Sequence, residues 1–311
     1  MTDATAPDLT HGFSVVVPAF NEGLAVGDVV RLIIETMAST GQPFEVIVVD
    51  DGSSDDTAIG ARDGGATVIS HPQNAGYGAA LKTGITRARY DHIVITDADG
   101  TYPIDRIPDL MSYADRFDMV VGARTGAHYR GSWFKEPARI ILGGMVEWVT
   151  GTSIPDVNSG LRVFRTALAR QYFHVISQGY SFTTTITLAA ISNGYFVKYL
   201  PIEYHRRVGS SKVRLARDIP RTTQIVLQAC VYYNPIKLFL TFAVGTALLA
   251  ILAWGLWFLT YSTPVGVLAA LLSVSVIHFV GIGMLADLIR VRNLPRAPTL
   301  TSHGASPAYH D

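Results

Sequence analysis

Acidic residues follow three apolar runs of the sequence, each at the point where the run ends. Glu22 comes after the first run, Asp50 and Asp51 after the second, and Asp97 and Asp99 after the third. Two carboxylates separated by one residue can share one hard cation, and Mg²⁺ or Mn²⁺ takes such oxygen ligands together with substrate phosphates. A bound cation would neutralise a departing diphosphate. The pair Asp97 and Asp99 therefore predicts a site for a divalent cation and a diphosphate.

No glycine-rich phosphate loop accompanies these acids in the sequence. The pattern G-x-x-x-x-G-K-[ST] is absent, and residues 76–81, Gly-Tyr-Gly-Ala-Ala-Leu, lack the third glycine of a dinucleotide fingerprint. We therefore expect the metal and basic side chains to hold the diphosphate. Each acidic cluster alone could be a turn, because Asp, Gly, Ser and Asn suit turns and helix N-caps. Three clusters at strand ends that could be neighbours in one sheet favour a shared site.

The elements that would position these residues alternate between strand and helix in the N-terminal part of the chain. Short β-branched runs, typical of buried parallel strands, occur at residues 13–18, 44–49, 66–69, 92–96 and 119–122. Patterns typical of helices lie between them, near residues 22–38, 55–63, 76–89 and 105–116. This order predicts an α/β fold with a doubly wound, mostly parallel sheet, whose ligands bind at the carboxyl ends of the strands.

A stretch without Asp, Glu, Lys or Arg runs from Leu238 to Ala286, longer than one helix needs to cross a hydrocarbon core of about 30 Å. Turn-forming residues interrupt it at 261–264. The sequence therefore predicts two transmembrane helices joined by a very short loop, at about residues 237–260 and 265–287. A buried helical hairpin of a soluble domain is the alternative interpretation.

We accordingly expect four parts in the chain. They are a cytoplasmic catalytic domain at residues 1–210, a juxtamembrane amphipathic segment at 211–235, two transmembrane helices within 236–289, and a disordered cytoplasmic tail at 290–311. Residues 1–12 are polar, so no signal peptide is expected.

Basic residues flank both predicted spans, whereas the loop between the spans carries no charge. They are Arg214, Arg217, Arg221 and Lys237 before the first span and Arg290, Arg292 and Arg296 after the second. The positive-inside rule predicts that both termini, and everything before residue 236, face the cytoplasm.

Composition excludes several classes of protein. Lys+Arg and Asp+Glu both number 25, so the chain lacks the bulk basic charge of a nucleic-acid-binding protein. A hydrophobic fraction of 49% excludes a disordered chain. The single cysteine, Cys230, excludes an internal disulfide framework and a cysteine-rich zinc site.

Five motifs in register now show a resemblance to a known family. They are VVVPAFNE at 15–22, VVDDGSSDDT at 48–57, DADG at 97–100, DVNSGLRVF at 156–164 and HRRVGSSK at 205–212. Together they resemble the inverting family 2 glycosyltransferases with a GT-A fold, and most nearly the polyprenyl-phosphate glycosyltransferases, the group of dolichyl-phosphate mannose synthase. The resemblance covers about residues 13–212, and a C-terminal pair of membrane helices also occurs in that group.

The resemblance implies roles for individual residues. Nucleotide-sugar-binding residues would be Pro18, Phe20, Glu22, Val49, Asp51, Asp97, Ala98, Arg124, Arg206 and Lys212. Asp99 would be the principal metal ligand, with Asp97 and Thr101 as the other candidates, although Thr101 stands where Gln or Ser is common. Acceptor-binding candidates would be Arg139, Ser159, Gly160 and Ser211. Catalytic roles would fall to Asp99, Asp156, Arg206 and Lys212.

The acceptor decides whether a general base is needed. A hydroxyl must lose its proton to attack, so a transferase to a hydroxyl would use Asp156 or another carboxylate as base. A phosphate monoester has a second pKa of about 6 and is already largely a dianion. The leading hypothesis is transfer of a hexose from a UDP- or GDP-sugar, with Mg²⁺ or Mn²⁺, to polyprenyl phosphate at a bacterial-type inner membrane, by a chain that can form a homo-oligomer. The alternatives are transfer to a lipid or glycan hydroxyl and a non-catalytic nucleotide-sugar-binding membrane subunit.

Overall fold

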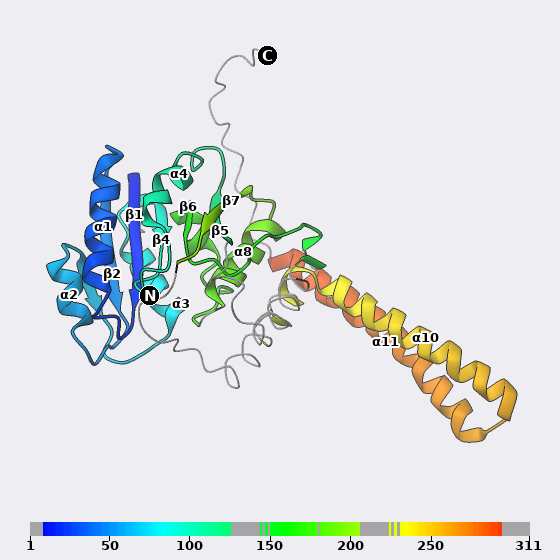
Figure 1. Cartoon of the computed structure of the whole chain (residues 1–311). Helices are drawn as coiled ribbons and strands as arrows, with labels where there is room; N and C mark the ends of the chain where they lie inside the picture. Colours follow the sequence, from blue (N-terminus) through cyan, green and yellow to red (C-terminus); the bar gives the residue numbers. More distant parts are fainter. Residues whose placement is uncertain are drawn as a thin grey trace, which may run out of the picture. The chain divides into compact units, whose positions relative to one another are not determined.

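The computed structural model of the chain describes residues 9–125, 144, 147–148, 150–179, 181–205, 224, 227–228 and 231–293. The chain divides into two compact units, Met1–Ala229 and Cys230–Asp311. Figure 1 labels most of the helices and strands of both. Four candidate site residues lie outside the described residues, namely Arg139, Arg206, Ser211 and Lys212. Residues 294–311 of the predicted disordered tail and most of the predicted juxtamembrane segment also lie outside them, whereas residues 290–293 are the end of a helix and not part of a disordered tail.

The first unit is built on one mixed sheet. Its strand order is β3 (Thr67–Ser70), β2 (Phe44–Asp50), β1 (Thr10–Ala19), β4 (Tyr90–Ile95), β6 (Arg162–Arg165), β5 (Met119–Thr125) and β7 (Val197–Glu203). Neighbouring strands are parallel except at β6, which runs antiparallel to both β4 and β5. The mostly parallel α/β sheet predicted from the sequence is confirmed, and β6 and β7 are strands that the sequence patterns did not reveal.

The central strand β1 is apolar because helices cover both faces of the sheet. Val15 and Val17 lie in one core cluster with helix α1 (Val26–Ser39). Val16 points to the opposite face, where it contacts Gly84 of helix α3 (Tyr77–Arg87). Since successive side chains of a strand point to opposite faces, a strand covered on both sides is mostly apolar, and the one buried hydroxyl of β1, that of Ser14, donates to Glu45.

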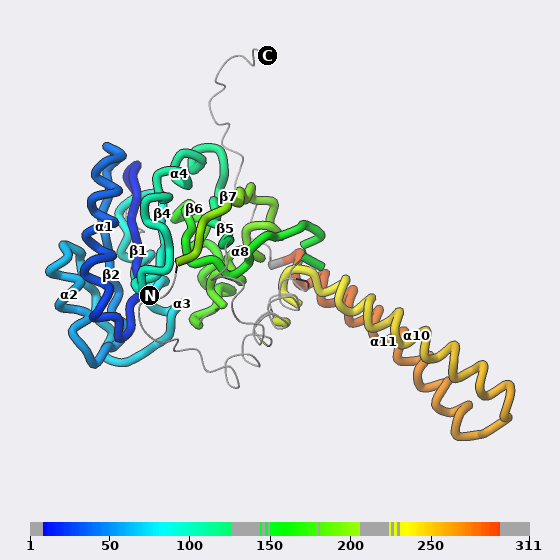
Figure 2. Tube along the Cα trace, viewed as in Figure 1, coloured from blue at the N-terminus to red at the C-terminus, as the bar shows by residue number. Residues whose placement is uncertain are grey.

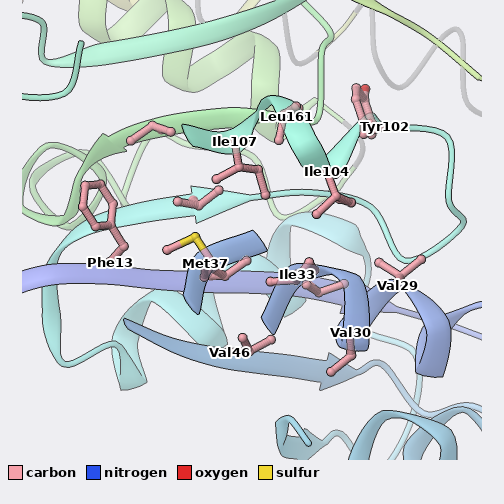
Figure 3. Close-up of a cluster of buried hydrophobic side chains, with 14 of the residues drawn as sticks. Phe13, Val29, Val30, Ile33, Met37, Val46, Tyr102, Ile104, Ile107 and Leu161 are labelled. Carbon is pink, nitrogen blue, oxygen red and sulfur yellow. The ribbon is translucent and has the colours of Figure 1, made fainter. Parts of the chain in front are cut away.

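Helix α1 packs on the sheet through one apolar face. Its buried residues recur at spacings of three and four, as an amphipathic helix requires, and are Val26, Val29, Val30, Ile33 and Met37. Figure 3 shows side chains of this face, among them Ile33 and Met37, near those of β1, β2 and the short helices η1 (Ile104–Arg106) and α4 (Ile107–Met111). The helix predicted from residue 22 begins at Val26, so residues 20–25 form a loop at the carboxyl end of β1.

Three more described helices complete the first unit: α2 (Thr57–Asp63), α7 (Thr166–Gln171) and α8 (Phe182–Ser192). Helix α8 is rich in threonine, which favours strands over helices. Its hydroxyls nevertheless bond to its own backbone, because Thr185 donates to the carbonyl of Ser181 and Thr187 to that of Thr183. Burial on nearly every side stabilises the helix despite its low propensity.

The second unit contains two long helices, α10 (Pro235–Thr260) and α11 (Thr263–Asn293), which lie side by side along their length (Figure 2). Trp254 donates a hydrogen bond to Ser273 across the pair (3.2 Å), and Gly283 makes room for Phe239. The link between the helices is shorter than the predicted loop, because Pro264 lies in the first turn of α11, where its missing N–H is no loss.

Both helices are long and apolar enough to cross a membrane. In their most apolar windows only 17% of α10 and 6% of α11 is buried, whereas the core helices of a soluble protein are mostly buried. Leu252 is 69% exposed and Ile277 is 73% exposed. This large exposed apolar surface on α10 and α11 favours contact with lipid.

The contact between α3 and the sheet yields a test of the fold. A Cβ atom at Gly84 would collide with Cγ1 of Val16 and lie 3.3 Å from Cγ2 of Val49. We expect Gly84→Ala to lower the free energy of unfolding by roughly 1–3 kcal/mol, because overpacking outweighs the helix propensity gained. Thermal unfolding of the purified protein measures the difference.

Gly60→Ala is the matched control, since Gly60 is also a helical glycine of this unit but its Cβ would meet no atom closer than Cγ1 of Val26 at 3.4 Å, an ordinary contact. Gly60→Ala should unfold at the wild-type temperature or slightly above it. Equal unfolding temperatures for the two variants would contradict the close packing of α3 on β1.

Candidate active site

The three acidic clusters come together because their strands are neighbours. Strands β2, β1 and β4 are adjacent and parallel, so their carboxyl ends lie at one edge of the sheet. The N–H of Asp51, just after β2, donates to the carbonyl of Ala19 at the end of β1 (2.8 Å). This edge therefore carries the chain that follows all three strands, as the sequence predicted.

Hydrogen bonds join the loop after β1 to the loop after β2. Asn21 has a left-handed backbone (φ 51°), its N–H donates to Oγ of Ser53 (2.8 Å), and its side-chain oxygen accepts from the N–H of Ser54 (2.8 Å). The N–H of Glu22 donates to Oγ1 of Thr57 (2.8 Å). These bonds fix the backbone around Phe20 and Glu22, two partly exposed candidates for the nucleotide pocket.

The two candidates on β1 and β2 themselves are buried. Pro18 lies in β1, and Val49 of β2 lies against helix α3 beside Gly84. Their contacts with a nucleotide stay a prediction.

Asp51 anchors a loop from the neighbouring part of the fold. Its buried carboxylate accepts hydrogen bonds from the N–H groups of Ala75 (2.9 Å) and Gly76 (2.8 Å), and it lies 2.6 Å from Nδ1 of His71. Nε2 of His71 in turn lies 2.9 Å from Oγ1 of Thr83. Asp51, predicted to contact the ribose or the base, thus lies beside the start of α3 and holds residues 71–76 in place.

Each carboxylate of the Asp97–Asp99 pair receives a hydroxyl from the chain. Oδ1 of Asp99 accepts from both the N–H (3.1 Å) and Oγ1 (2.6 Å) of Thr101, and both residues are buried. Oδ1 of the partly exposed Asp97 accepts from the hydroxyl of Tyr77 (3.0 Å). Ala98 is buried between them. The pattern is that of two oriented carboxylates.

The negative charges of Asp97 and Asp99 both affect the pKa of Tyr204, which follows β7. Burial raises the pKa of Tyr204, and the negative charges of Asp97 and Asp99 raise it further. Burial and then Asp97 also raise the pKa of Tyr77 well above its ordinary value, so its phenol stays protonated and donates. The charge of the pair is therefore felt by side chains from α3 and from the chain after β7.

Asp156 is held by an arginine fork. Its oxygens lie 2.8 Å from Nε and 2.9 Å from Nη2 of Arg124, and they also accept from the N–H of Arg124 (3.1 Å) and of Asn158 (3.0 Å). Burial alone would raise the pKa of Asp156, but these hydrogen bonds and the charge of Arg124 lower it. A carboxylate with a lowered pKa and four donors is a weak proton acceptor.

The loop that follows Asp156 lies directly against the Asp97–Asp99 pair. The N–H of Gly160 donates to the hydroxyl of Tyr102 (2.6 Å), and a Cβ at Gly160 would lie 3.0 Å from Oδ1 of Asp97. The hydroxyl of the buried Ser159 donates to the carbonyl of Gly122. The structure therefore brings the predicted acceptor loop and the predicted metal ligands into contact.

A buried arginine that sequence reasoning missed organises this loop. Arg162 is fully buried; Nη2 donates to the carbonyl of Val157 (2.6 Å) and Nε to that of Ser159 (2.7 Å). Nη1 donates to Thr183 and Thr187 of α8. Burial lowers the pKa of Arg162. In the sequence, Arg162 is marked by being a charged residue among the apolar residues 161–164.

Known proteins share this arrangement to different extents. The model of the family "Glycosyl transferase family 2" matches residues 14–173, a range that includes all three strand-end clusters and the loop 156–160. The chain is 29% identical over 302 residues to an undecaprenyl-phosphate 4-deoxy-4-formamido-L-arabinose transferase of Edwardsiella ictaluri, across 91% of this chain and 90% of that protein. A protein of the same name from Serratia proteamaculans is 30% identical over 234 residues, across 72% and 69%.

A solved structure shares the fold. Glucosyl-3-phosphoglycerate synthase from Mycobacterium tuberculosis, crystallised with Mn²⁺, uridine diphosphate and glucosyl-3-phosphoglycerate, aligns with a TM-score of 0.58 and 21% identity. The alignment covers 71% of this chain and 80% of that one.

The Arg124–Asp156 pair predicts a pH-dependent stability difference. The pKa of Asp156 is lower in the folded than in the unfolded protein. The ionised carboxylate therefore contributes its full share of the free energy of unfolding above the ordinary carboxyl pKa of 3.8, and this share is lost as the pH falls below that value. We expect Asp156→Asn to lower the free energy of unfolding at pH 7 by roughly 3 kcal/mol, because the guanidinium loses its counter-charge. The difference from wild type should narrow below about pH 4 in thermal unfolding.

Asp109→Asn is the control, because Asp109 is exposed and pairs with Arg106 at the surface. It should leave the unfolding temperature nearly unchanged at every pH. A gap between Asp156→Asn and wild type that stayed constant down to pH 3 would contradict the ion pair.

Proposed function

Because the chain belongs to glycosyl transferase family 2, it is a glycosyltransferase, and we propose that it transfers a sugar from a nucleotide sugar to polyprenyl phosphate at a membrane. The named relatives support this acceptor, since both are undecaprenyl-phosphate sugar transferases. The two exposed apolar helices support the membrane, because a polyprenyl acceptor stays in the bilayer.

The observation that carries the proposal is the state of Asp156. Its two oxygens are held by Arg124 and by backbone N–H groups, and its pKa is lowered. A hydroxyl acceptor would need this residue or another carboxylate as a base, whereas a phosphate acceptor is already ionised, its second pKa being about 6. We infer that Asp156 is a positioning residue that holds the Arg124 guanidinium in one orientation.

The Asp97–Asp99 pair suits a divalent cation. Oriented carboxylates are the hard oxygen donors that Mg²⁺ and Mn²⁺ take alongside phosphate oxygens. When bound, the cation would supply charge neutralisation for the departing diphosphate. Oγ1 of Thr101 is already a donor to Asp99, so we propose that Thr101 orients this ligand rather than binding the metal itself.

The residues of the chain would then align and neutralise two anions. In the proposed step an acceptor phosphate oxygen forms a bond to the anomeric carbon, the bond from that carbon to the nucleoside diphosphate breaks, and the configuration inverts. Arg124 would balance phosphate charge, and Arg206 and Lys212 would close over the diphosphate. Phe20, Glu22 and Asp51 would take the nucleoside, and Arg139 and Ser211 with the loop 156–160 the acceptor. Placing the reactants and offsetting their repulsion accounts for catalysis without a proton acceptor.

The proposed donor is a UDP- or GDP-hexose, and the names of the relatives add a nucleotide-activated 4-deoxy-4-formamido-L-arabinose to the donors worth testing. We expect purified protein in detergent, with Mg²⁺ or Mn²⁺, to move radiolabel from one such donor into polyprenyl phosphate. Polyprenol of the same chain length should take no label. The measurement is label in the lipid phase and release of nucleoside diphosphate.

Asp99→Asn should reduce transfer by about 100-fold or more, because the proposed cation loses its principal ligand. Asp109→Asn, the same change at an exposed position outside the site, should leave transfer unchanged. Label on polyprenol would contradict the phosphate acceptor and would make Asp156 the base to test. Nucleotide-sugar binding without turnover would indicate a non-catalytic subunit.

We also propose that the catalytic unit and both ends of the helical hairpin face the cytoplasm. Lys237 lies in the first turn of α10, and Arg290 and Arg292 lie in the last turn of α11, so described basic residues flank both helices at the same end of the hairpin. In a Cys230→Ser background, Ser262→Cys should react with a membrane-impermeant maleimide in intact bacterial cells. Asn293→Cys should react only after permeabilisation.

The reverse labelling pattern would overturn this orientation. Equal labelling of both variants in inside-out vesicles would overturn the membrane-spanning hairpin itself.

A further inference from the structure

The hydroxyl of Tyr77 ends on the carboxylate of a proposed metal ligand. Tyr77 is the first residue of α3, and its hydroxyl donates to Oδ1 of Asp97 (3.0 Å). No nucleotide-sugar, acceptor or metal role was expected for this tyrosine from the sequence. A hydrogen bond to one oxygen of a carboxylate fixes the plane of that carboxylate and so the direction of its second oxygen.

The backbone that carries Tyr77 is held on both sides. The preceding residues Ala75 and Gly76 donate their N–H groups to Asp51, and the N–H of Ala79 donates to the carbonyl of Gln178 (2.9 Å). Gly78 lies so close to the carbonyl of Ser177 that a Cβ would collide with it. The phenol is therefore presented from a fixed point.

The loop 156–160 also lies against Asp97, at the same carboxylate oxygen. A Cβ at Gly160 would lie 3.0 Å from Oδ1 of Asp97 and 3.2 Å from its carboxyl carbon. Asp99 has the equivalent arrangement, because Oγ1 of Thr101 donates to its Oδ1 (2.6 Å). Each carboxylate of the pair thus has one hydroxyl that orients it, one from its own loop and one from α3.

We infer that Tyr77 is a positioning residue that orients Asp97 for the divalent cation bound with the nucleoside diphosphate. This inference rests on the proposed function, which supplies the cation. Partners that orient ligands of this kind typically raise metal affinity or activity 10- to 100-fold. Tyr77 acts through Asp97, a proposed cation ligand. Asp51, predicted to contact the nucleoside, holds the residues that precede Tyr77. Residues 71–77 therefore join the two predicted sites.

Tyr77→Phe removes only the hydroxyl and keeps the ring that packs there. Binding of UDP and of GDP to the purified full chain is measured against increasing Mn²⁺, together with kcat at low and at saturating Mn²⁺. We expect the half-saturating Mn²⁺ concentration to rise about 10-fold or more. Nucleotide binding without metal should stay within about twofold of wild type, and excess Mn²⁺ should restore kcat.

Tyr195→Phe is the matched control, because the hydroxyl of Tyr195 donates to Gln171 (3.1 Å), away from the pair. It should titrate with Mn²⁺ like wild type. If Asp99→Asn abolishes the Mn²⁺ dependence while Tyr77→Phe titrates like wild type, the inference about Tyr77 is overturned and the proposed function stands.

Two other results would also decide against it. A Tyr77→Phe protein that unfolds at a lower temperature and binds nucleotide poorly at every Mn²⁺ concentration would show a merely structural role. If binding to the wild-type chain does not depend on Mn²⁺, the cation site of the proposed function fails and the inference fails with it.

Discussion

The fork between Arg124 and Asp156 is the interaction on which the rest of the site depends. It ties the end of β5 to the loop that precedes β6, and that loop in turn packs on the Asp97 carboxylate through Gly160. In the proposed mechanism the pair also explains the chemistry, since the lowered pKa of Asp156 makes it a counter-charge for Arg124 rather than a proton acceptor. Taking both charges out of water is costly, and the fork geometry with its extra backbone donors is what offsets that cost.

Much of the fold could be predicted because it depends on local pattern. Mostly apolar, β-branched runs at β1, β2 and β4 indicated strands covered on both faces, and helical patterns between them indicated a parallel sheet. That these three strands are neighbours placed their acidic ends at one edge, and the structural likeness confirms the GT-A fold inferred from the motifs. The charge-free C-terminal stretch likewise gave two helices, which the structure extends to Pro235 and Asn293.

The remainder depends on contacts between segments far apart in the chain. Strand β6 has only four residues, two of them arginine, and its pairing comes from β4 and β5 rather than from its own pattern. Tyr77 lies in a glycine-rich stretch that was considered only as a phosphate loop, and nothing in its spacing from Asp97 signals a hydrogen bond. Asp51 was expected to meet a nucleoside, and its bonds to residues 71–76 could not be foreseen because loop geometry decides them.

The reversed direction of β6 settles how the acceptor loop can reach the site at all. In a wholly parallel sheet only segments that leave a strand arrive at the carboxyl edge, and every segment that enters a strand lies at the far edge. Arg162, the first residue of β6, pairs with Ile95, the last residue of β4, so here an entering segment arrives at the same edge as the departing ones. One antiparallel strand thus lets the end of an entering segment, residues 156–161, lie at the edge where chain segments otherwise only leave their strands.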